Sequence, residues 1–168
     1  MFLIGLLNFL RPSDISRIRL SSHSKHENFA TLQIPDPKER KPKTVWVNKY
    51  EDDAICPYLT LLNYLERTKE LRANSCDKLF ISTRNPYSEA SATTISRWLK
   101  NSIRISTSEL TARSIRSSAA TLCLDKGTSI EVVTEIGNWS SDSMFWKHYK
   151  AHSQLTQGRL NMTGKLLK

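Results

Sequence analysis

The chain has 168 residues, of which 39% are hydrophobic and 24% charged, and this composition is ordinary for one globular domain. Its 25 Lys and Arg residues against 16 Asp and Glu give a net charge of +9, which favours a polyanionic partner such as nucleic acid. Three scattered cysteines without a C-x-x-C pair argue against a zinc ribbon or a disulfide framework, and favour a reducing, intracellular compartment.

The first 20 residues are predicted to be helical. Residues 1–9 are mostly apolar and are expected to form a buried helix that ends near Pro12. Ser13 or Asp14 is expected to begin a second helical stretch that runs through Leu20. The apolar run at residues 1–7 lacks a basic start and a small-residue cleavage site, and it is too short to cross a bilayer, so no membrane association is expected.

A β-hairpin with a basic tip is predicted next. Residues 29–34 and 43–47 are rich in strand-forming side chains. Between them, residues 35–42 combine three prolines with several positive charges, which is typical of a polar turn.

The rest of the chain is predicted to be helical. Pro57 is expected in the first turn of a helix, Gly127 just after the end of another, and Ser129 as an N-cap. The expected helices cover residues 57–71, 88–103, 108–125, 129–137 and 141–151. The fold class is therefore mostly α with one small antiparallel β-sheet (α+β).

Three motifs in a fixed order carry the chemistry. Arg11 lies three residues before Asp14, Arg113 lies three residues before Arg116, and the segment 137–149 contains Trp139 and ends at Tyr149. Each motif alone has a bland explanation, because arginines usually line solvated helix faces and aromatic residues usually pack. Their conjunction in this order resembles the catalytic domain of tyrosine recombinases, which include the phage-type integrases.

The resemblance implies a site-specific DNA recombinase that cleaves and rejoins strands through a 3′-phosphotyrosyl intermediate. Tyr149 would be the nucleophile, and Arg11, Arg113 and Arg116 would bind the phosphate. Trp139 stands where most members have His and would donate its indole N–H to a phosphate oxygen. Asp14 replaces the commoner Glu and could orient Arg11. The stretch after Trp139 looks more like DIRS-type and Crypton-type mobile elements than bacterial integrases.

The hairpin supplies the lysine that the resemblance calls for as general acid. Lys38, the first lysine after the first hairpin strand, is the expected residue, with Lys41 and Lys43 as alternatives. Further contacts to DNA are expected from the basic hairpin and from the helix 88–103, through Arg40, Lys41, Lys43, Arg97 and Lys100.

Arg113 occupies a position that is usually His, and arginine cannot move a proton near neutral pH. The alternative function is therefore a catalytically inactive or domesticated DNA-binding module of the same fold. His pairs such as His23 and His26 lack a third ligand at a suitable spacing, so neither a metal nor any other cofactor is expected.

The resemblance covers residues from about 3 to 151. Residues 1–151 are expected to form the catalytic domain without the separate N-terminal DNA-binding domain of the family. Residues 152–168 are expected to be a tail that docks onto a neighbouring protomer. The expected partners are double-stranded DNA and further copies of the protein, in a dimeric or tetrameric synapse. The protein would be intracellular and associated with DNA, in the nucleus if the source is eukaryotic.

Overall fold

A computed structural model describes residues 1–35, 42–73, 76–104, 112–139, 141 and 143–147. The helices are α1 (Phe2–Leu7), α2 (Pro12–Ile15), α3 (Pro57–Thr68), α4 (Ala92–Arg104), α5 (Ala112–Asp125) and α6 (Ile130–Gly137), with a 3-10 turn η1 (Asp53–Ile55) and further helical residues at 143–147. The strands β1 (Arg19–Lys25), β2 (Phe29–Ile34) and β3 (Lys43–Asn48) form one antiparallel sheet in the order β1-β2-β3. The predicted fold class is confirmed.

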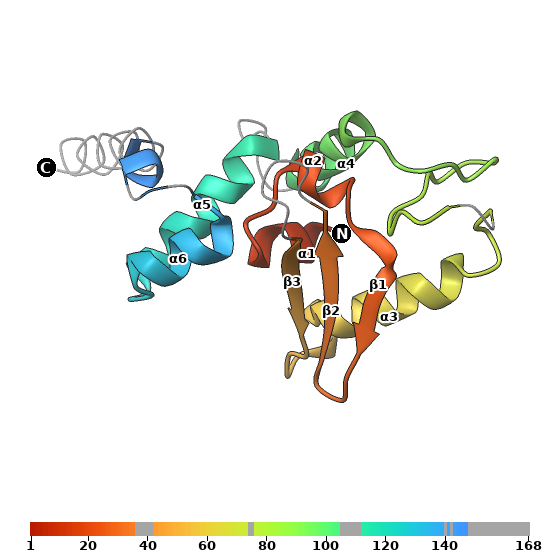
Figure 1. The fold of residues 1–168 in the computed structure, drawn as a ribbon, viewed down its shortest axis with the longest axis horizontal. Helices are drawn as coiled ribbons and strands as arrows, with labels where there is room; N and C mark the ends of the chain where they lie inside the picture. The colour runs from red at the N-terminus through yellow and green to blue at the C-terminus, as the bar shows by residue number, and fades with distance from the viewer. Residues whose placement is uncertain (36–41, 74–75, 105–111, 140, 142, 148–168) are drawn as a thin grey trace, which may run out of the picture.

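The sheet buries one face. Side chains alternate along β2 and β3, so that Leu32 and Val45 are fully buried, whereas Trp46 is 52% exposed on the opposite face. Helix α3 packs near β3, and Figure 1 shows α5 and α6 set to the other side of α1, away from the sheet. The β2–β3 pairing confirms the predicted hairpin, whose tip at residues 36–41 lies outside the described residues.

The prediction of a helix through Leu20 is wrong, because β1 begins at Arg19. The amide N–H of Leu20 donates to the Asp77 carbonyl at 2.7 Å, and the amide of Ser21 donates to the Asp77 carboxylate at 2.8 Å. Strand β1 is a Ser-rich segment without apolar alternation. Its conformation therefore depends on pairing with β2 and with Asp77, which lies far along the chain.

Three helices end in the same hydrogen-bonded turn, in which one residue adopts a left-handed conformation. These residues are Phe9 (φ 48°) after α1, Gly127 (φ 88°) after α5 and Asn138 (φ 52°) after α6. In each case the next amide reaches back five residues, as in Leu10 N–H to the Gly5 carbonyl at 2.9 Å. The predicted roles of Gly127 and of Ser129, which caps α6, are confirmed.

Two predicted helix boundaries shift. Helix α3 ends at Thr68 rather than near Leu71, and α4 begins at Ala92 rather than Ser88. Residues 88–90 instead pair with residues 80–82, since the Ala90 amide donates to the Phe80 carbonyl at 2.9 Å. Residues 108–111 and the tail 152–168 lie outside the described residues. Within the described part of the chain, no helix is both long and apolar enough to cross a membrane.

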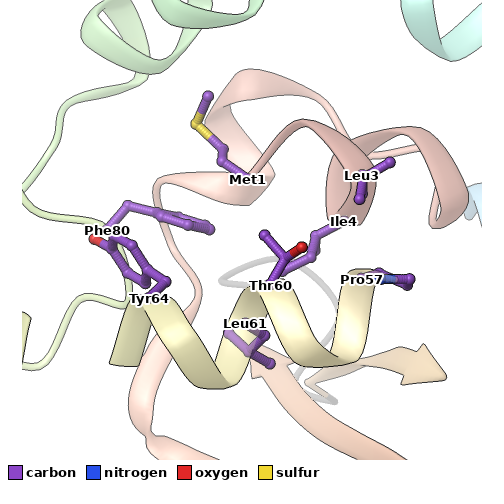
Figure 2. Close-up of a pocket in the computed structure, with 8 residues that line it drawn as sticks. All are labelled: Met1, Leu3, Ile4, Pro57, Thr60, Leu61, Tyr64 and Phe80. Atoms are coloured by element: carbon purple, nitrogen blue, oxygen red, sulfur yellow. The ribbon is translucent and has the colours of Figure 1, made fainter. Parts of the chain in front are cut away.

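Helix α1 lies between two apolar cores. Ile4 belongs to the larger core around the sheet, and Phe9 belongs to a smaller one with residues of α5 and α6. Against α3, Met1 and Leu3 of the α1 segment leave a gap of about 10 Å³ over Leu61 (Figure 2). A gap of that size holds at most about one water molecule, so it is a packing defect and not a ligand site.

Because Phe9 has a left-handed backbone conformation, glycine should be tolerated better than alanine at this position. Its ring is 3% exposed, so both Phe9→Ala and Phe9→Gly should destabilise the fold. Alanine keeps the left-handed strain whereas glycine relieves it, so we expect Phe9→Gly to be about 1 kcal/mol more stable than Phe9→Ala in urea unfolding. If Phe9→Ala were the more stable variant, as alanine is within helices, the left-handed conformation of Phe9 would be contradicted.

Candidate active site

Arg11 stands at the start of α2, where the chain leaves α1. Its amide N–H donates to the Asp14 carboxylate at 2.9 Å, and its side chain is exposed. The other oxygen of that carboxylate accepts from Arg17 at 2.9 Å. Asp14 therefore holds Arg11 through its backbone amide.

Arg116 lies in the first half of α5 and is 8% exposed. Its guanidinium donates to the Gly137 carbonyl at 2.7 Å and lies over the Trp139 ring, with Cζ 4.1 Å from the ring centroid. A guanidinium over an indole face is a favourable cation–π contact. The carbonyl and the ring together fix the position of Arg116.

Trp139 follows the left-handed Asn138 and packs among aromatic rings. Its ring centroid is 6.1 Å from that of Phe9 and 5.1 Å from that of Phe145. The ring also covers Gly137, where an added Cβ would fall 1.5 Å from a ring carbon. Gly137 is therefore required for close approach of the indole. The role of Trp139 as the surface beneath Arg116 was missed, because sequence alone does not show which ring faces which cation.

Lys43 is the first residue of β3, and its side chain extends to the end of α6, next to the carbonyl that binds Arg116. Its ammonium donates to the Asn8 carbonyl at 3.3 Å and to the Ile136 carbonyl at 2.5 Å. These carbonyls belong to the C-terminal ends of α1 and α6, whose last carbonyls have no partner within the helix. An ammonium has three N–H donors, and these two carbonyls use two of them within the described part of the chain.

Burial and neighbouring charges lower the pKa values of Lys43 and Arg116. Burial, followed by the positive charge of Arg116, lowers the pKa of Lys43 to about 8, and Arg11 adds to this while Asp14 opposes it. Burial and then Arg11 lower the pKa of Arg116 to about 10, again against Asp14, so Arg116 remains charged at neutral pH. The structure thus brings Lys43, Arg116 and Trp139 together from three separate segments, and Arg11 lies near enough for its charge to affect Lys43 and Arg116.

Other expected site residues fall in different places. Arg113 lies in α5 one turn before Arg116, but its side chain is outside the described part of the structure. Arg97 and Lys100 are exposed on α4, which packs against α2. The remaining candidates, Lys38, Arg40, Lys41 and Tyr149, lie outside the described residues.

The side chains at this site gather positive charge, which is suited to an anion. Two guanidinium groups match the paired oxygens of a phosphate, and a lysine with a lowered pKa can give up a proton near neutral pH. In the described part of the chain, no group of three or more His, Cys, Asp or Glu side chains lies close enough to hold a metal ion.

Residues 1–155 match the model of the phage integrase family, so the chain belongs to that family. Among curated protein sequences, none matches the chain.

Solved structures of recombinases share the fold. XerA recombinase is 19% identical with a TM-score of 0.63, over 89% of this chain and 56% of its own. XerH site-specific recombinase in a pre-cleavage complex with its difH substrate is 17% identical with a TM-score of 0.68, over 89% and 41%. A lambda integrase dimer bound to a core site is 17% identical with a TM-score of 0.60, over 88% and 50%. The chain therefore spans about half the length of these proteins and has the catalytic-domain fold of tyrosine recombinases.

The lowered pKa of Lys43 makes stability depend on pH. An unfolded lysine titrates at 10.5 and the folded Lys43 at about 8, so between these pH values the unfolded chain binds more protons. The free energy of unfolding should therefore rise with pH across this window. In Lys43→Met this contribution should vanish, which is measured as the difference between the two proteins in urea titrations at several pH values. The variant Lys100→Met, at an exposed position, should keep the wild-type slope.

Proposed function

We propose that residues 1–151 form the catalytic domain of a site-specific DNA recombinase, with residues 152–168 as a tail that contacts a neighbouring protomer. The observation that carries the proposal is the convergence of Arg11, Lys43 and Arg116 beside Trp139. Membership of the phage integrase family supports the same reaction class.

The reaction begins with attack of the Tyr149 oxygen on a DNA phosphate. A bond forms between this oxygen and phosphorus, the bond to the 5′-oxygen breaks, and the phenolic proton leaves to solvent. Because negative charge grows on the non-bridging oxygens, the guanidinium groups of Arg11 and Arg116 stabilise the transition state. A free 5′-hydroxyl then attacks the 3′-phosphotyrosyl link and rejoins the strands.

Lys43 is the lysine that the geometry supports best as general acid. Its ammonium adjoins Arg116, its pKa of about 8 suits proton donation near neutral pH, and two carbonyls leave one N–H for the departing 5′-oxygen. Lys38 was the sequence-based choice and, like Lys41, remains a prediction without described geometry.

Trp139 and Arg113 complete the proposed site. Trp139 holds the guanidinium of Arg116 over its ring and thereby aims it at the phosphate. Arg113 lies one turn before Arg116 in α5, and its side chain would add a third guanidinium on the same helical side. Since arginine keeps its proton, this site would rely on charge at the position where most members of the family have His.

Double-stranded DNA is the proposed partner. The net charge of +9 supports it, and the XerH neighbour was solved with its DNA substrate. Arg97 and Lys100 would contact phosphates from α4, as would Arg40 and Lys41 from the hairpin. Self-association on DNA, an intracellular and DNA-associated location, and kinship with DIRS-type or Crypton-type elements remain predictions.

Tyr149→Phe tests the nucleophile. Because only one oxygen is removed, folding and DNA binding should survive, while the SDS-resistant protein–DNA adduct on a nicked suicide duplex should disappear. Arg116→Ala should still form the adduct, at a rate lower by about 10²–10³, since one donor to the transition-state phosphate is lost. The exposed Tyr50→Phe is the matched control and should react at the wild-type rate.

The covalent adduct and the salt dependence of DNA binding together distinguish a recombinase from an inactive DNA-binding module. An adduct that persists in Tyr149→Phe would assign the nucleophile to another residue. Salt-dependent binding with a log–log slope of about −0.9 per neutralised phosphate, without any adduct in the wild type, would favour the inactive DNA-binding module. Binding that does not respond to salt would contradict both functions.

A further inference from the structure

Asn8 directly follows α1 as its C-cap residue and is 7% exposed. Its side-chain amide donates to the Trp46 carbonyl at 3.0 Å and to the Ile4 carbonyl at 3.2 Å. Its side-chain oxygen accepts from the Trp46 amide at 3.2 Å. A single side chain therefore makes three hydrogen bonds, which use both of its N–H donors and one of the two lone pairs of its oxygen.

These contacts pair backbone groups at the edge of β3 that a neighbouring strand would otherwise pair. In the sheet order β1-β2-β3, strand β3 has one edge without a strand neighbour. The Asn8 amide binds both the N–H and the carbonyl of Trp46, in the way that a paired strand residue would. Because buried backbone groups without partners are costly, this link should hold β3 firmly at the end of α1.

The backbone carbonyl of Asn8 also contacts the candidate site, through Lys43. Its carbonyl accepts from the Lys43 ammonium at 3.3 Å, and Lys43 lies three residues before Trp46 on the same strand. Asn8 thus contacts β3 at two places, through its side chain and through its backbone. Together they fix both the strand that carries Lys43 and one of the two carbonyls that hold its ammonium.

We propose that Asn8 is a positioning residue for Lys43, which it places beside Arg116 by binding the edge of β3 with its side chain and the ammonium with its carbonyl. The relevance of this to DNA cleavage rests on the proposed function, but the positioning itself is a property of the free protein. Asn8 contacts no substrate in this account and acts through Lys43 alone.

The test is the titration of Lys43, followed by competitive acetylation with acetic anhydride and peptide mass spectrometry across pH 6–11 (a range of about five units around the lysine pKa values). In the wild type, Lys43 should titrate near pH 8. In Asn8→Leu and Asn8→Ser, the edge of β3 is released and Lys43 becomes more hydrated, so its titration should move up toward 10.5. The experiment uses the full 168-residue chain and no DNA.

Two controls separate positioning from general loosening. Asn48→Leu makes the same chemical change at an exposed position of β3 and should leave the Lys43 titration unchanged. Leu79→Ala weakens the same core at a fully buried residue outside the gap under α1, and should also leave it unchanged.

An unshifted Lys43 in folded Asn8 variants would overturn the proposal, as would an equal shift in Leu79→Ala. If neither Asn8 variant folds, the residue serves the stability of the whole domain and the proposal is again wrong. Failure of the recombinase reaction would show as absence of the Tyr149 adduct while the Lys43 shift persists, so the two ideas fail separately.

Discussion

The site depends on two helix ends whose unpaired carbonyls converge on the same cations. Helix α1 offers the carbonyl of Asn8, and α6 offers those of Ile136 and Gly137. Lys43 and Arg116 satisfy these groups, and positive charge is favoured there because helix dipoles place partial negative charge at C-terminal ends. The same hydrogen bonds join the sheet-centred core to the smaller α5–α6 core, so the geometry of the site and the packing of the domain are coupled.

This arrangement trades stability for function. The burial that positions Lys43 and Arg116 also lowers the pKa of each, which means that their charged forms are held at a cost in folding free energy. The backbone adds a further cost at Phe9, a bulky residue in the left-handed region at the entrance to Arg11. Packing of Phe9 and Trp139 offsets part of these costs, and an incoming phosphate would offset more by neutralising the cations.

Local sequence signals predicted the elements that rest on local chemistry. Pro57, Gly127 and Ser129 were assigned their helix-end positions because each acts through its own backbone or cap. Strand β1 was missed because its partners, β2 and Asp77, are distant and its serines show no apolar period. The motif order selected Arg11, Arg116 and Trp139 as candidates, but it did not reveal that Asn8 binds the edge of β3 or that Trp139 lies under Arg116.

The central claim is that Arg11, Lys43 and Arg116 form one phosphate-binding pocket. Crystals of the chain soaked with tungstate, a heavy tetrahedral oxyanion, would test it directly by anomalous scattering. The account predicts one dominant peak within hydrogen-bonding distance of both Arg11 and Arg116, which disappears in Arg116→Ala. Peaks scattered over exposed lysines, with the space between these two arginines empty, would contradict it.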